Sequence, residues 1–142
     1  AIKEAEKALK EGEVPVGAVV VYNGEIIGRG YNLKESKKDP TLHAEIIAIR
    51  NAAQKLGDWR LYNCSLYVTL EPCVMCFGAI LNSRIGKLIY GAENIEEGYS
   101  KFMLSTESYK KWNKVEVISG VKKERCELLI KEFFEKLRSS RL

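Results

Sequence analysis

Four side chains in two short segments of this sequence could together carry out chemistry. His43 and Glu45 stand two residues apart in His-Ala-Glu, and Cys73 and Cys76 stand three apart in Pro-Cys-Val-Met-Cys. An imidazole and two thiolates are ligands that Zn²⁺ accepts, and a catalytic zinc site keeps its fourth position open for water. The remaining carboxylate, Glu45, suits a proton carrier beside that water. The two segments therefore predict a catalytic zinc site.

The pattern H-x-E followed by P-C-x-x-C is typical of zinc-dependent deaminases that act on nucleobases or nucleosides. Two other interpretations compete with it. A C-x-x-C pair alone can be a redox dithiol, and a closed structural zinc site could take Cys64 or Cys126 as its fourth ligand. The redox interpretation leaves His43 and Glu45 unexplained. Cys64 and Cys126 stand in apolar patterns that favour buried, unligated cysteines. The residues rank the deaminase first, structural zinc second and redox third.

The composition of the chain indicates which class of protein carries this predicted site. The chain has 142 residues, 46% hydrophobic and 30% charged, which fits one globular domain and excludes a disordered chain. We expect residues 1–142 to form a single zinc-dependent deaminase domain. No apolar run reaches the length of a membrane span. Cysteines in a metal motif favour a reducing cytoplasm, and a net charge of +4 favours a polyanionic partner.

The predicted elements place the four side chains at helix starts. One helix begins near His43 and Glu45, and the strand that ends at Glu71 leads into a second helix that begins near Cys73 and Cys76. Cysteines three apart on a helix share a face, and the positive end of a helix favours thiolates. The hypothesis also requires His43 and Glu45 to approach one ion, which the less regular backbone of a helix start allows.

Helical and extended segments alternate along the rest of the chain. Periodicity predicts helices over residues 1–10, 43–54, 73–81 and 123–138, and strands over residues 16–21, 25–30, 65–70, 87–90 and 115–118. Asn23-Gly24 predicts a hairpin between the first two strands. The order of elements favours an α/β fold, a three-layer α/β/α sandwich around one mixed sheet.

Further segments extend the two motifs. These are residues 13–18 (EVPVGA), 39–45 (DPTLHAE), 67–76 (YVTLEPCVMC), 83–86 (SRIG) and 132–134 (EFF). Through them, nearly the whole chain resembles the TadA-type tRNA adenosine deaminases. The resemblance implies a cytidine-deaminase-like fold, a homodimer, and conversion of adenosine to inosine at the wobble position of a tRNA anticodon.

The resemblance also implies roles for individual residues. One Zn²⁺ per chain is expected on His43, Cys73 and Cys76, where it activates a water as the hydroxide that attacks C6 of a flipped-out adenine. Glu45 is expected to carry protons to N1 and to the departing ammonia. The implied substrate contacts are the base-binding Asn32, the apolar wall of Val14 and Pro15, Ala44, and Asn94 near the ribose, where the family commonly has Asp.

Residues 93–114 depart from the family pattern. Basic residues alternate there with aromatic ones, a composition that suits phosphates and unstacked bases. They are Lys101, Lys110, Lys111 and Lys114 with Tyr99, Phe102, Tyr109 and Trp112. A solvated loop whose aromatic rings pack into the core is the alternative.

Other functions stay open because this segment differs from the family. One is a small-molecule deaminase of cytosine, guanine or nucleosides, and another is a deaminase of single-stranded DNA. A non-catalytic RNA-binding subunit with structural zinc is a third, but it would have no use for Glu45.

Overall fold

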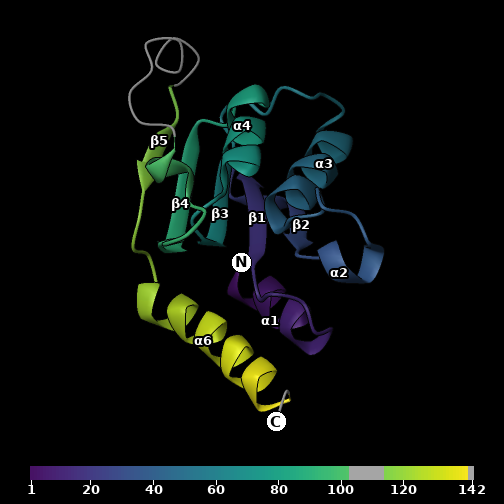
Figure 1. The fold of residues 1–142 in the computed structure, drawn as a ribbon. Coiled ribbons are helices and arrows are strands. Elements are labelled where there is room, and N and C mark those ends of the chain that lie inside the picture. Colours follow the sequence, from purple (N-terminus) through teal and green to yellow (C-terminus); the bar gives the residue numbers. More distant parts are fainter. Residues whose placement is uncertain (103–113, 141–142) are drawn as a thin grey trace.

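A five-stranded mixed sheet forms the centre of the computed structural model, which describes residues 1–102 and 114–140 (Figure 1). The strand order is β2-β1-β3-β4-β5. β1 pairs antiparallel with β2 and β3, whereas β3, β4 and β5 are parallel. The strands are β1 (Gly17–Tyr22), β2 (Glu25–Tyr31), β3 (Ser65–Leu70), β4 (Lys87–Ala92) and β5 (Glu116–Ile118).

Helices lie against both faces of this sheet. α1 and α6 contact each other, α1 packs on β1, and α6 packs on β4 (Figure 1). On the opposite face, α3 packs on β1 and β2 and contacts α4. The described helices are α1 (Ile2–Lys10), α2 (Lys34–Lys37), α3 (Ala44–Leu56), α4 (Val74–Asn82) and α6 (Lys123–Ser139), with the 3₁₀ turn η1 (Tyr99–Lys101). The predicted three-layer α/β/α sandwich is confirmed.

The predicted hairpin joins β1 to β2. Asn23 and Gly24 both have positive φ, 49° and 76°, which is the backbone conformation of the turn that Asn-Gly favours. The register pairs Tyr22 with Glu25 on either side of the turn. The predicted helices and strands recur with bounds shifted by at most two residues, and α2 and η1 are additions that periodicity does not reveal.

Two glycines on one face of β2 bring α3 directly onto the sheet. A Cβ atom on Gly30 would lie 2.7 Å from the backbone nitrogen of Ala48, and one on Gly28 would lie 2.7 Å from that of Ala52. Residues two apart in a strand share a face, so both positions must lack a side chain for the helix to pack this closely. Gly28 and Gly30 therefore allow α3 to pack closely on β2, and this packing determines where α3 lies.

Some of the predicted features fall outside the described residues. Tyr109, Lys110, Lys111 and Trp112 lie in the interval 103–113. Within the ranges that are described, no helix combines the length and the apolar character needed to cross a membrane.

Candidate active site

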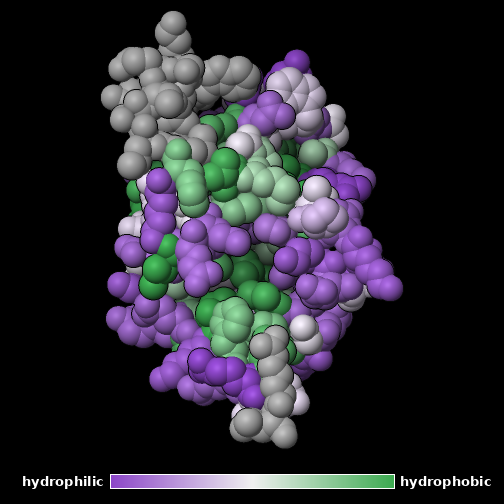
Figure 2. Space-filling model, viewed as in Figure 1, coloured by the Kyte–Doolittle hydropathy of each residue, from purple (hydrophilic) through white to green (hydrophobic). Residues whose placement is uncertain are grey.

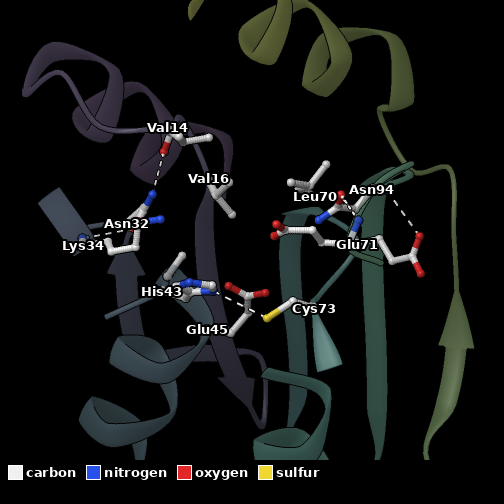
Figure 3. Close-up of a pocket in the computed structure, with 12 residues that line it drawn as sticks. Val14, Val16, Asn32, Lys34, His43, Glu45, Leu70, Glu71, Cys73 and Asn94 are labelled. Carbon is white, nitrogen blue, oxygen red and sulfur yellow. Dashed lines mark hydrogen bonds between the residues drawn. The ribbon is translucent and has the colours of Figure 1, made fainter. Parts of the chain in front are cut away.

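His43 and Cys73 are the capping residues of two helices whose starts face each other. His43 precedes α3 with extended backbone angles (φ −79°, ψ 156°), and Cys73 precedes α4 with similar ones (φ −73°, ψ 175°). Glu45 lies in the first turn of α3. Because the backbone changes from extended to helical between His43 and Glu45, these two side chains reach the same pocket (Figure 3). In a continuous helix, residues two apart do not face each other.

The donor atoms of the predicted metal site lie at distances that suit zinc. His43 Nδ1 is 3.6 Å from Cys73 Sγ and 3.5 Å from Cys76 Sγ, and the three donors lie within 4.8 Å of one another. Zinc bonds of about 2.3 Å to sulfur and about 2.0–2.1 Å to nitrogen place a tetrahedral nitrogen and sulfur donor roughly 3.5–3.6 Å apart. The residues present therefore fit a Zn²⁺ ion.

The other two cysteines are remote from this group. Cys64 belongs to the hydrophobic core and is 1% exposed, and Cys126 is buried beneath β4, against Gly91. In the part of the chain that the structure describes, no fourth His, Cys, Asp or Glu joins the three donors. This arrangement favours an open site over a closed structural one, which would need a fourth protein ligand.

Burial and mutual contact change the acidity of the site residues. Burial raises the pKa of Glu45 to about 7, and this residue is 3% exposed. A hydrogen bond from Cys76 is the main reason that the pKa of Cys73 falls to about 4, and the same bond raises the pKa of Cys76. The pKa of His43 is raised by its hydrogen bond with Cys73. A carboxyl group with a pKa near neutrality can both accept and release protons at physiological pH.

Above this centre lies a pocket with two walls (Figure 3). Its volume is about 130 Å³, which is less than the roughly 300–1,000 Å³ of sites for drug-sized ligands and suits a single base. The first wall consists of Val14, Val16, Asn32 and Lys34, and the second of Leu70, Glu71, Asn94 and Glu97, with His43, Ala44, Glu45 and Cys73 between them.

Asn32 is held in the first wall by the backbone around it. Its side-chain nitrogen donates to the Val14 carbonyl at 3.5 Å, and its oxygen accepts from the Lys34 backbone nitrogen at 3.2 Å. An amide has two N–H groups and an oxygen with two lone pairs. The side chain is therefore fixed in direction and keeps capacity for a further partner in the pocket.

Most of the predicted substrate-binding residues line the pocket. Val14, Asn32, Ala44 and Asn94 do so, but Pro15 does not, because it is fully buried beneath the wall. Successive side chains of an extended segment point to opposite sides, so the partner of Val14 in the wall is Val16 rather than Pro15.

Five lining residues were not predicted from the sequence. They are Val16, Lys34, Leu70, Glu71 and Glu97. Spacing offered a signal for two of them, since Lys34 stands two residues after Asn32 and Glu71 stands two before Cys73. Of the predicted aromatic residues, Tyr99 packs in the core and is 8% exposed, as the alternative interpretation expected, whereas Phe102 is 65% exposed.

Comparisons with known proteins agree with this geometry. The family model of MafB19-like deaminases matches residues 1–138. The tRNA-specific adenosine deaminase of Bacillus subtilis is 46% identical over 142 residues, covering 99% of this chain and 88% of the relative. That of Haemophilus influenzae is 48% identical and covers 99% of this chain and 83% of the relative.

A solved structure extends the similarity to three dimensions. It comes from work on A-to-I editing by tRNA:A34 deaminases at the wobble position of transfer RNA. It superposes with a TM-score of 0.83 at 39% identity, covering 91% of this chain and 94% of the other. The chain is a member of the deaminase family, and within it belongs to the tRNA-specific adenosine deaminases.

Proposed function

We propose that this protein hydrolytically deaminates adenosine to inosine at the wobble position of a tRNA anticodon. The observation that supports the reaction is the meeting of His43, Cys73 and Cys76 beside the buried carboxyl group of Glu45 in one small pocket. The substrate is inferred from relatives at 46–48% identity that are named tRNA-specific adenosine deaminases.

We propose that His43, Cys73 and Cys76 hold one Zn²⁺ per chain. When bound, the metal would lower the pKa of a water so that the water becomes nucleophilic near neutral pH. Glu45 would take a proton from the attacking water and deliver it to N1 of the adenine as the water oxygen bonds to C6. It would then move the proton of the new C6 hydroxyl to the amino group, so that the C6–N6 bond breaks and ammonia leaves. Its burial, which raises its pKa to about 7, suits both transfers.

The other pocket residues would hold the base. Val14, Val16 and Leu70 supply apolar surface on both walls and exclude water. Asn32 is already oriented by two backbone contacts and would bond the edge of the base. Lys34 lines the first wall, and its positive charge would attract an RNA phosphate.

We further propose that two copies associate through the outer face of α4. Val74 and Met75 are 41% and 38% exposed, and a Cβ atom on Gly78 would contact nothing within 4 Å. Figure 2 shows apolar surface over α4. Trp59 and Tyr62, in the loop between α3 and β3, are also exposed, at 51% and 56%. Met75→Glu should convert a dimer to a monomer by light scattering at micromolar concentration, and a monomeric wild-type protein would contradict the proposal.

The cellular setting is proposed on the same basis. The four cysteines are free, which agrees with a reducing cytoplasm. We propose that residues 1–142 work as one deaminase domain, which the match of the family model over residues 1–138 supports.

The deciding experiment is mass spectrometry of products after incubation with four substrates: an anticodon stem-loop RNA, the matching single-stranded DNA, free adenosine, and free guanine with cytosine. Inosine in the RNA supports the proposal, with Glu45→Gln as the inactive control. Deamination of free bases alone would replace it with a small-molecule deaminase. Tight RNA binding without any product would replace it with a non-catalytic subunit.

A further inference from the structure

A buried carboxylate that takes no part in the proposed proton transfers joins two distant segments at the pocket. Glu71 is 3% exposed. Its Oε1 accepts from the Asn94 backbone nitrogen at 3.3 Å, and its Oε2 accepts from the Ser100 backbone nitrogen at 3.1 Å and from Ser100 Oγ at 2.6 Å. Both oxygens of Glu71 are therefore occupied by donors from residues 94–100.

Three more contacts attach residues 94–100 to the segment that carries the predicted zinc ligands. The Tyr99 backbone nitrogen donates to the Pro72 carbonyl at 2.9 Å, and Gly98 forms an isolated β-bridge with Cys73. The ring of Tyr99 stacks on that of Phe77, with centroids 3.7 Å apart and planes 7° from parallel. Residues 94–100 are thus bound to residues 71–77 by both backbone and side-chain contacts.

The fit between these two segments leaves no spare room. A Cβ atom on Gly98 would lie 2.5 Å from Glu71 Cδ, 2.6 Å from Glu71 Oε1 and 2.6 Å from the Asn94 carbonyl oxygen. Gly98 has φ −61°, a conformation open to any residue. Glycine is therefore needed here for space, and the space it leaves is filled by the Glu71 carboxylate.

The opposite side of the same segment forms the second wall of the pocket. Asn94 and Glu97 line the pocket from this wall, and Cys73 and Glu45 line it between the two walls (Figure 3). The Glu97 backbone nitrogen donates to Asn94 Oδ1 at 3.0 Å, and the Gly98 nitrogen donates to the Asn94 carbonyl at 3.0 Å. The turn from Asn94 to Gly98 is thus internally bonded, so a shift at Glu71 moves both lining residues.

We propose that Glu71 is a positioning residue, which holds the Asn94–Glu97 rim at a fixed place relative to Cys73 and Glu45 and thereby sets the affinity for the polynucleotide around the target base. The inference rests on the proposed function, because the rim can act only on the nucleotides that flank a base held in the pocket. Glu71 itself touches no reacting atom.

Glu71→Gln tests the proposal, because the amide replaces one acceptor oxygen by a donor that faces N–H groups. The KM for an anticodon stem-loop should rise about tenfold, the effect of losing a hydrogen bond to a charged group. The kcat per zinc-loaded enzyme should change less than about threefold, since a rise in KM alone reports lost uniform binding. Zinc content should stay at one ion per chain by mass spectrometry of the metal.

Further variants separate positioning from a general loss of structure. Gly98→Ala disturbs the same contact from the other side and should reproduce the rise in KM, and the double variant should be no worse than the poorer single one. Ser100→Ala keeps the carboxylate and should give a smaller rise. Glu4→Gln, at a carboxylate 4% exposed in α1 and outside the pocket, should leave KM unchanged.

The outcomes distinguish this proposal from the proposed function. If the wild-type protein forms no inosine in the stem-loop, the proposed function fails. If the wild-type protein is active and Glu71→Gln and Gly98→Ala both keep the wild-type KM, the positioning role fails. It also fails if zinc content and apparent kcat fall in both variants while KM stays constant, because this pattern reports a smaller fraction of folded enzyme.

Discussion

The two walls of the pocket are each supported by a buried carboxylate, but the two supports differ in what they are connected to. Glu13 supports the first wall: it is fully buried and accepts from the backbone nitrogens of Glu35 at 3.0 Å and Ser36 at 2.6 Å. Glu71 supports the second wall by accepting from Asn94 and Ser100. In both cases a carboxylate accepts from at least one backbone N–H group near the start of a short helix, which has no partner within that helix.

The two carboxylates differ in how close they stand, along the chain, to a predicted zinc ligand. Glu13 belongs to the loop before β1 and holds α2, while His43 and Glu45 are placed separately by the packing of α3 on Gly28 and Gly30. Glu71 stands two residues before Cys73, so one segment carries both the support and a predicted ligand. We therefore expect changes at the first wall to separate stability from catalysis, and changes at the second wall to alter substrate binding directly.

The largest expected effects are at Glu45, the proposed proton carrier near the start of α3, and at Cys73, the predicted zinc ligand at the start of α4. Glu45→Gln should keep one zinc ion per chain and lower turnover about 10²–10⁴-fold, the usual contribution of a general acid–base group. Cys73→Ala should lose both the metal and the activity. Metal analysis and turnover on the stem-loop separate the two variants. An active Glu45→Gln, or a Cys73→Ala that retains zinc, would contradict the assigned roles.

Gly30→Ala should reveal how α3 and the two site residues at its start, His43 and Glu45, are positioned between the walls. Its Cβ atom would lie 2.7 Å from the Ala48 nitrogen and force α3 away from β2. Such overpacking typically costs about 1–3 kcal/mol, which lowers Tm by several degrees, and the shift of His43 and Glu45 should lower kcat. Gly86→Ala is the matched control, because its Cβ atom would meet only the Cys64 carbonyl at 3.8 Å. Equal Tm values for the two variants would refute the packing argument.

Glu13→Gln should lower stability in a pH-dependent way. Burial alone would raise the pKa of Glu13, but the hydrogen bonds from Ser36 and Glu35 outweigh it and lower the pKa. A lowered pKa in the folded state means that the ionised group contributes stability above its unfolded pKa of about 4.3 and loses it as the pH falls further. The variant should be about 1–3 kcal/mol less stable at pH 7.

Denaturant unfolding at a series of pH values checks this prediction. The stability gap between the wild-type protein and Glu13→Gln should be constant near neutrality and should narrow as the pH falls below about 4. A gap that is as large at pH 3 as at pH 7 would rule out the ionised carboxylate as its source. The KM for the stem-loop should change less than in Glu71→Gln, because Glu13 does not line the pocket.

The smallest expected effect is at Asn94, on the rim that Glu71 holds. Its Oδ1 accepts from the Glu97 nitrogen, and the side chain also lines the pocket, so capping and sugar recognition are both open to it. Asp would accept more strongly from a 2′-OH, which only RNA has. Asn94→Asp should raise the RNA-to-DNA rate ratio several-fold, corresponding to about 1 kcal/mol. An unchanged ratio on matched hairpins would leave capping as its only role.

The sequence by itself determined the local features of this protein. The donor types and spacings of His43, Cys73 and Cys76 predicted which side chains meet, because together they supply the ligand set of a catalytic zinc site. The Asn23-Gly24 turn and the helix and strand periods depend on neighbouring residues, so they too could be read from the chain. The resemblance to a known family added Asn32 and Asn94, which line the pocket.

Only the tertiary structure decided which distant segments support that site. Glu71 and Ser100 are 29 residues apart, and no periodic pattern connects a carboxylate to the backbone N–H groups of a remote turn. Packing between elements also decides three other features. They are the stacking of the buried Tyr99 ring on Phe77, the burial of Pro15 and the close approach of Gly30 to α3. Local propensity acts over a few residues, whereas the shape of a pocket depends on contacts that form when the whole core is assembled.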